Sequence, residues 1–190
     1  MKNKSLLVFI VFSVFTILSV SSPNLLRSKE PNIMNITINR TGKNVSVQFT
    51  LGNCFTQEME EAILSGIPTT FLFSINLNEN RNFWFDKKII TGHIKHTVKY
   101  DSLQEEFHLT YNGKGKNPTV VKDFNIAKKM MAEVKEDIVV PENILTDGQD
   151  LYFKIRAKLD SAALPFYLDY LLFFVSSWDF ETDWYTKNLN

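Results

Sequence analysis

Apolar and polar residues alternate along much of the chain after residue 33. The alternation covers the segments 34–38, 45–51, 71–77, 94–100, 107–111 and 151–159. Because successive side chains of a β-strand point to opposite faces of a sheet, this period of two predicts strands with one buried and one solvated face. The polar connections at 41–44 and 78–80 predict turns between neighbouring strands. The chain is therefore predicted to consist mainly of antiparallel hairpins.

Two segments instead have apolar residues three and four apart, which is the spacing of a helix. The first follows Thr56, a good N-cap residue, and ends before Gly66. The second extends from about residue 121 to residue 136. The apolar face of the second helix is formed by Phe124, Ala127, Met131 and Val134. Both helices are short and amphipathic, so we expect each to cover one part of a sheet.

Many short strands and two helices predict a mainly β domain, α+β by content, with an antiparallel β-sandwich or an open barrel as its architecture. An immunoglobulin-like sandwich is one option within this class. We divide the chain into a signal peptide or N-terminal anchor (1–21), a linker (22–32) and a single β-rich domain (33–187).

The N-terminus has the composition of an export signal. Lys2 and Lys4 precede the apolar run 6–20, and small residues follow up to a possible cleavage site after Ser21. The run is shorter than the roughly 20 residues of a spanning helix. A cleaved signal peptide and a retained anchor both remain open, and membrane tethering is expected only for the retained form. In either case we expect an exported protein, in the periplasm or on the outer face of the cytoplasmic membrane.

Charge and cysteine content exclude some function classes. The chain has 21 basic and 21 acidic residues, and cleavage after Ser21 would leave 19 basic residues and a formal charge of −2. A nucleic-acid-binding protein would normally have a basic excess, so no nucleic-acid partner is expected. Cys54 is the single cysteine, which excludes an intramolecular disulfide.

Aromatic residues gather in three places, which are residues 71–73, residues 83–85 and the last 27 residues. Residues 83–86 read Phe-Trp-Phe-Asp, which we interpret as the start of a strand. The segment 164–185 is the richest in aromatic residues: Phe166, Tyr167, Tyr170, Phe173, Phe174, Trp178, Phe180, Trp184 and Tyr185. The C-terminal segment reads as buried strands at the end of a sheet, with an aromatic contact surface as the alternative.

The histidines do not predict a metal site. His93 and His96 are three residues apart and would point to opposite faces of a strand. The hairpin register that opposes apolar residues pairs Val98 with Phe107 and Ile94 with Tyr111. That register keeps His96 away from His108, which leaves too few ligands for zinc. We expect His96 to be a half-buried sheet residue and the other two to be solvated.

No catalytic motif is present in the sequence. Cys54 lacks a basic neighbour that would activate its thiol, and we interpret it as a buried structural residue. Asp86 is a carboxylate beside bulky apolar residues, where burial could raise the pKa as in an acid catalyst. A catalytic role would need a second group, for which Asp101 or a histidine is the candidate. No cofactor is expected.

Several short sequence motifs resemble those of a known family. They are AILSGIPTTF (62–71), RNFWFD (81–86), YDSL (100–103), LP (164–165) and WDFETDW (178–184). In this order they resemble an uncharacterised bacterial exported family, the domain of unknown function number four-three-nine-zero, over about residues 30 to 187. The resemblance implies an envelope protein that is often encoded beside a membrane two-component sensor kinase. It brings no catalytic residue or cofactor with it.

These observations favour binding over catalysis. We predict an exported envelope protein that acts as an interaction module, with the sensory region of the kinase as its possible partner. The candidate interaction or structural residues are Arg81, Trp84, Asp86, Tyr100, Asp101, Pro165, Trp178 and Trp184. The alternatives are a hydrolase-like envelope enzyme that uses Asp86, and a sandwich that holds a lipid or another amphiphile between aromatic faces.

Overall fold

The computed structural model of the chain describes residues 30–81, 83–112, 117–145, 149–160 and 179–189. The predicted signal peptide or anchor (1–21) lies outside the described residues. Pro165, Trp178 and the buried strand predicted at 171–175 lie outside them as well. The described part of the chain forms two antiparallel sheets and two α-helices.

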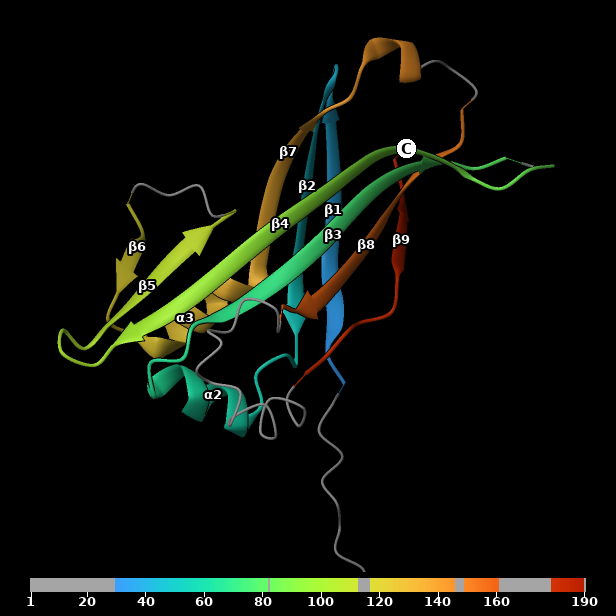
Figure 1. Cartoon of the computed structure of the whole chain (residues 1–190). Coiled ribbons are helices and arrows are strands. Elements are labelled where there is room, and N and C mark those ends of the chain that lie inside the picture. The colour runs from blue at the N-terminus through green and yellow to red at the C-terminus, as the bar shows by residue number, and fades with distance from the viewer. Residues whose placement is uncertain (1–29, 82, 113–116, 146–148, 161–178, 190) are drawn as a thin grey trace, which may run out of the picture.

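The smaller sheet has three strands in the order β1-β2-β7, and the larger has six in the order β6-β5-β4-β3-β8-β9. The bounds in the smaller sheet are β1 (Asn32–Thr41), β2 (Asn44–Gly52) and β7 (Glu133–Val139). The bounds in the larger sheet are β3 (Thr69–Glu79), β4 (Lys87–Asp101), β5 (Glu106–Tyr111), β6 (Thr119–Val121), β8 (Leu151–Leu159) and β9 (Tyr185–Asn188). The two sheets lie face to face in a sandwich-like arrangement, with the long β3 and β4 strands crossing the smaller sheet (Figure 1).

The prediction of a mainly β domain with two short helices is confirmed. The strands of the described ranges do not close into a barrel. Their order also differs from that of an immunoglobulin domain, because β3, β4, β5 and β6 follow one another as a meander within one sheet. The fold is therefore a two-sheet sandwich with a meander as its larger layer.

A row of aromatic rings joins the two sheets. Phe49 of β2 contacts Phe73 of β3 with ring centroids 5.7 Å apart, and both side chains are buried. Phe73 contacts His96 of β4 at 5.1 Å, and His96 contacts Tyr111 of β5 at 4.6 Å. Edge-to-face pairs of this kind add about 0.5–1.5 kcal/mol each to the effect of burial. The core therefore fixes the inner faces of four strands at once.

The predicted alternation is confirmed for the strands that border this core. In β8, the side chains of Leu151, Phe153, Ile155, Ala157 and Leu159 are buried, and those between them are half-buried. The β1–β2 turn places Gly42 at a φ of +61°, a backbone conformation that glycine adopts without strain. Alternation and turn chemistry thus specify these strands locally.

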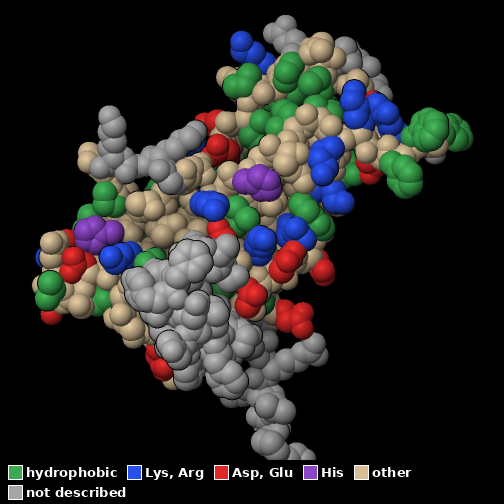
Figure 2. Space-filling model, in the orientation of Figure 1, with side chains coloured by type: hydrophobic (Ala, Val, Ile, Leu, Met, Phe, Trp, Pro, Cys, Tyr) green, Lys and Arg blue, Asp and Glu red, His purple; other side chains and the backbone are tan. Residues whose placement is uncertain are grey.

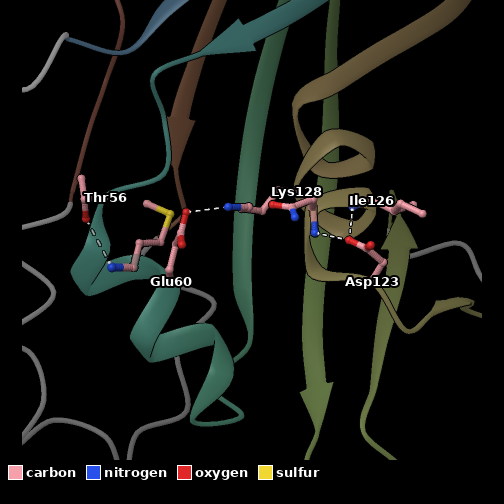
Figure 3. Close-up of polar contacts among 7 residues, drawn as sticks. Thr56, Glu60, Asp123, Ile126 and Lys128 are labelled. Atoms are coloured by element: carbon pink, nitrogen blue, oxygen red, sulfur yellow. Dashed lines mark hydrogen bonds and ion pairs between the residues drawn. The ribbon is translucent and has the colours of Figure 1, made fainter.

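Capping explains where the two helices begin. The Thr56 hydroxyl accepts a hydrogen bond from the Met59 amide at 3.3 Å, and α2 (Gln57–Leu64) follows. The Asp123 carboxylate accepts from the amides of Asn125 and Ile126 at 2.7 and 3.2 Å, and α3 (Phe124–Ala132) follows. Each cap satisfies amide groups that have no partner within the helix. Both caps are drawn in Figure 3.

An ion pair links the two helices. The Lys128 ammonium of α3 lies 2.8 Å from the Glu60 carboxylate of α2 (Figure 3), and both side chains are partly buried. The same ammonium lies 4.9 Å from the Phe124 ring centroid, so it is held from two sides. α3 in turn contacts strands of both sheets. The helices therefore brace one end of the sandwich.

The second helix is shorter than the sequence predicts. α3 ends at Ala132, and residues 133–139 form β7, which pairs with β2 from Asn44↔Val139 to Thr50↔Glu133. Val134 lies opposite Phe49 in this register, so its apolar side chain enters the core as part of a strand. The pairing also gives β2 a second hydrogen-bonded neighbour. The helical spacing of Val134 with Met131 was misleading because 134, 136 and 138 also fit a strand.

Two further expectations are wrong in detail. Residues 83–86 form a turn between β3 and β4 and not the start of a strand. The β4–β5 hairpin pairs Val98 with Leu109 and Tyr100 with Phe107, which is two residues from the predicted register. A shift of two residues keeps every side chain on its predicted face. The Tyr100 and Phe107 rings lie 4.7 Å apart and account for the observed choice.

Replacement of Phe73 by alanine should lower the free energy of unfolding by about 3–5 kcal/mol, because it leaves a cavity between the sheets. Urea denaturation would measure this loss. Phe83→Ala on the same hairpin is the matched control and should change the value by less than about 0.5 kcal/mol, because that ring is almost fully exposed. Equal losses in the two variants would contradict the assigned core.

Candidate functional site

Three consecutive aromatic residues stand at the end of the β3–β4 hairpin. Phe83, Trp84 and Phe85 are 96%, 78% and 95% exposed, and we call these three residues the aromatic tip. Large aromatic side chains are normally buried in folded proteins, so an exposed group of three is a candidate interaction surface. The hairpin extends beyond the smaller sheet (Figure 1), and hydrophobic side chains stand out at its end in the space-filling view (Figure 2).

The base of the aromatic tip is held by strand β8 and the residues before it. The Tyr152 hydroxyl of β8 donates a hydrogen bond to the Asp86 carboxylate. Asn80 makes two contacts with Asp150: its amide donates to the carbonyl at 2.8 Å, and its side chain donates to the carboxylate at 2.7 Å. Desolvation, and after it the bond to Asp86, raises the pKa of Tyr152, so this hydroxyl keeps its proton. The rings are therefore presented on a fixed base.

Basic residues surround the aromatic tip. Lys87 and Lys88 follow it at the start of β4, and both are exposed. Arg81 precedes it and lies 3.6 Å from the Glu79 carboxylate. Lysine and arginine side chains continue along the visible face behind the tip (Figure 2). The site thus combines an apolar end with a cationic flank.

The structure places the sequence-predicted residues at several separate locations. Arg81, Trp84 and Asp86 come together at the tip. Tyr100 and Asp101 lie at the opposite end of the 15-residue strand β4, about 50 Å away along the strand. Asp101 accepts hydrogen bonds from the amides of Leu103 and Gln104, which lower the pKa of its carboxyl and close the β4–β5 turn. Tyr100 and Asp101 therefore have structural roles.

Trp184 holds the C-terminal segment against β8. Its ring lies under the Lys154 ammonium at 5.5 Å and the Arg156 guanidinium at 4.5 Å from the centroid. Arg156 also forms an ion pair with Glu181. These contacts tie the described part of the C-terminal segment to the basic outer face of the large sheet, as cation–π pairs do at partly exposed positions.

Neither Asp101 nor a histidine, the predicted catalytic partners of Asp86, lies near it, and its hydrogen-bond partner is Tyr152. Asp101 is at the far end of β4, and His93 is seven residues, roughly 23 Å, along the strand. His96 points into the core. General acid–base catalysis needs groups within hydrogen-bond reach of one substrate, and these are too far apart. In the described ranges, no three His, Cys, Asp or Glu residues form a group that could hold a metal ion.

Two buried groups have structural explanations. His96 is buried, deeper than the half-buried position we predicted, and its Nδ1 donates to the Met131 carbonyl at 3.0 Å. Cys54 is buried as predicted, and desolvation raises the pKa of its thiol to about 12. A thiol with this pKa carries almost no thiolate near neutrality, so it is not a nucleophile.

A groove of about 640 Å³ opens between β7 and the β4–β5 hairpin. Its lining combines the buried residues Phe49, Ile94 and His96 with the exposed residues Glu133 and Lys135. In an amphiphile-binding sandwich, aromatic rings of the two sheets would surround a lipid. Here such rings contact one another, as Phe49 and Phe73 do. The groove is thus a mixed polar surface next to a filled core.

The sequence patterns did not identify most of the aromatic tip or the lysines that follow it. The predicted site residues did not include Phe83, Phe85, Lys87 and Lys88, although all four are exposed. A signal was present, since three consecutive bulky residues cannot all enter the core from one strand, whose side chains alternate between faces. The run Phe-Trp-Phe followed by Asp-Lys-Lys was therefore better interpreted as a solvent-exposed turn.

The architecture defines a two-sheet β domain with a projecting aromatic hairpin. The chain belongs to the family described as Domain of unknown function (DUF4390), whose model matches residues 28–188. No curated protein matches the chain. Within the described ranges, no helix is both long and apolar enough to cross a membrane.

Asp86→Asn should leave stability within about 1 kcal/mol of wild type, because the amide oxygen can still accept the Tyr152 hydroxyl. Cells that carry this variant as their sole copy should behave like wild type if Asp86 is structural. Tyr152→Phe is the control, because it removes this hydrogen bond and keeps the Asp86 carboxylate. Loss of function in Asp86→Asn alone, with normal folding, would instead support the hydrolase-like alternative.

Acidification should destabilise the protein through His96. Burial lowers the pKa of His96 below its usual value of 6.5, against the smaller opposing effect of its hydrogen bond to Met131. Below pH 6.5 the unfolded chain therefore binds more protons at this site than the folded chain. The contribution is fully present above that pH and is lost as the pH falls towards the folded value.

Urea denaturation at about pH 7.5 and about pH 5.5 measures this effect. His96→Gln removes the titrating group, so the stability difference between the two pH values should be smaller in the variant than in wild type. An identical difference in both proteins would contradict the role of His96.

Proposed function

We propose that this protein is an exported, non-catalytic binding module of the cell envelope, and that the aromatic tip is its contact surface. Export is supported by the basic start at Lys2 and Lys4 and the apolar run that follows. The location that fits is the periplasm or the outer face of the cytoplasmic membrane.

The exposure of Phe83, Trp84 and Phe85 carries this proposal. Complete burial of three such side chains would contribute about 5–9 kcal/mol before the costs of association. Strand β8 holds the base of the tip, so little conformational freedom would be lost on binding. A rigid group of aromatic residues is the usual energetic centre of an interface.

The sensory region of a membrane sensor kinase is the protein partner that we propose, on the basis of the gene neighbour that the family resemblance implies. A module that docks at the membrane surface would be in reach of such a region. The proposed role is therefore that of an accessory to the kinase.

Site-specific photo-crosslinking in cells tests the contact surface. Replacement of Phe85 by p-benzoylphenylalanine keeps an aromatic ring at the tip and allows capture of whatever lies against it. Irradiation should give adducts with envelope components, and mass spectrometry would identify them.

The matched control is p-benzoylphenylalanine at Leu103, which is also 95% exposed but lies in the turn at the other end of β4. We expect adducts from position 85 and few from position 103. The same yield and the same adducts at both positions would show that the tip is not the contact surface, and the proposed function would fail.

A further inference from the structure

We propose that the aromatic tip inserts into the interface of an anionic phospholipid bilayer, and that the basic outer face of the large sheet lies towards the lipid headgroups. This inference rests on the proposed function of the tip as a contact surface and names the partner of that surface. Three features of the structure carry it: the shape of the tip, the chemistry of its rings and the distribution of charge behind it.

The shape of the tip favours binding to a lipid bilayer over binding to a protein pocket. Phe83 and Phe85 are 96% and 95% exposed, with Trp84 between them at 78%, so the three rings are open on nearly every side. A protein pocket usually encloses one or two anchor side chains that share a direction. Lipid chains can surround a projecting turn completely, because they rearrange around whatever enters.

The chemistry of the rings also fits a bilayer interface. Tryptophan is enriched where hydrocarbon meets headgroups, because its ring is apolar and its indole N–H is polar. Phenylalanine on either side of Trp84 supplies the apolar surface that would be removed from water. The hairpin backbone beneath the rings is already paired between Asn78↔Lys88 and Glu79↔Lys87, so insertion of the tip leaves these strand hydrogen bonds in place.

The outer face of the large sheet carries the charge expected next to anionic headgroups. On this outer face, the residues of β3 are polar or aliphatic, and each neighbouring strand places cationic residues opposite some of them. The cationic residues of this face are Lys88 and Lys95 on β4 and Lys154, Arg156 and Lys158 on β8.

Acidic residues lie beside this set and offset part of its charge. Asp160 pairs with Lys95 at 2.7 Å, and Glu181 pairs with Arg156. Nearer the tip, Glu79 pairs with Arg81, and Asp86 and Asp150 accept hydrogen bonds from Tyr152 and Asn80. Neither Lys88 nor Lys154 forms an ion pair in the described structure. Lys154 lies over the Trp184 ring, whereas Lys88 is exposed and can attract lipid phosphates within a Debye length of the surface.

Fluorescence of Trp84 in the full chain tests the insertion directly. The protein is mixed with vesicles of phosphatidylglycerol and phosphatidylcholine whose acyl chains are brominated, so that a ring inserted into the bilayer is quenched. Trp178 and Trp184 also emit, so the signal of Trp84 is the difference between the wild-type protein and the variant Trp84→Phe. Trp84→Phe keeps an apolar tip but should remove the blue shift and the quenching.

Two pairs of variants measure separately how the apolar rings and the basic residues contribute to membrane binding. Trp84 is kept in all of them as the fluorescent probe. Phe83→Ser with Phe85→Ser should raise the lipid concentration for half-maximal quenching about tenfold or more, whereas Leu103→Ser should leave it unchanged. Lys87→Glu with Lys88→Glu should raise it by a similar factor on anionic vesicles, whereas Lys135→Glu on the exposed side of β7 should not. Circular dichroism would confirm that each variant folds.

Three outcomes overturn the proposal. Trp84 emission that does not respond to brominated vesicles excludes insertion, and equal responses to anionic and purely neutral vesicles exclude an anionic partner. An unresponsive Trp84 together with a single protein adduct from position 85 would assign the tip to a protein, leaving the proposed function standing. If position 85 gives no specific adduct and Trp84 is not quenched, both proposals fail.

Discussion

The contact between Phe49 and Phe73 is the interaction on which the rest of the structure depends, because it joins the two sheets at the centre of the core. Phe73 continues the contact to His96, and His96 to Tyr111, so β2, β3, β4 and β5 are positioned by one connected set of rings. Close packing of this kind permits few alternative arrangements. The β3–β4 hairpin is anchored by this set at one end, and its other end can therefore project rigidly into solvent.

The same arrangement separates the residues with structural roles from the exposed aromatic tip. His96 and Cys54 are buried in the core, and Asp101 closes the β4–β5 turn. Burial or hydrogen bonding explains the pKa shift of each of these three residues. Asp86 accepts a hydrogen bond from Tyr152 at the base of the tip, and Asp101 and His93 lie far from it along β4. The aromatic tip is exposed, and so are Lys87 and Lys88, which follow it. That combination is the basis of the proposed binding to an apolar, negatively charged surface.

Local patterns predicted much of this fold, and their failures have identifiable causes. Alternation was enough for β2 and β8, where one face is buried against the other sheet. Alternation was not enough at 133–139. The spacing of Val134 and Met131 fits a helix, and the spacing of Val134 and Ile138 also fits a strand. Pairing with β2 selects the strand. The β4–β5 register was wrong by two residues because two registers oppose apolar residues equally well, and the Tyr100–Phe107 contact selects one of them.

The sequence by itself determined the class of fold, the helix starts and the buried thiol, because periodicity, capping and composition act over a few neighbouring residues. It also marked Arg81, Trp84 and Asp86 as residues of interest. Only the tertiary structure decided that these three share one hairpin end, that Tyr100 and Asp101 lie at the other, and that Phe83 and Phe85 face solvent. Exposure depends on what packs against a residue. The residues that pack against a given side chain often come from strands that are distant in the sequence, so no local pattern predicts its exposure.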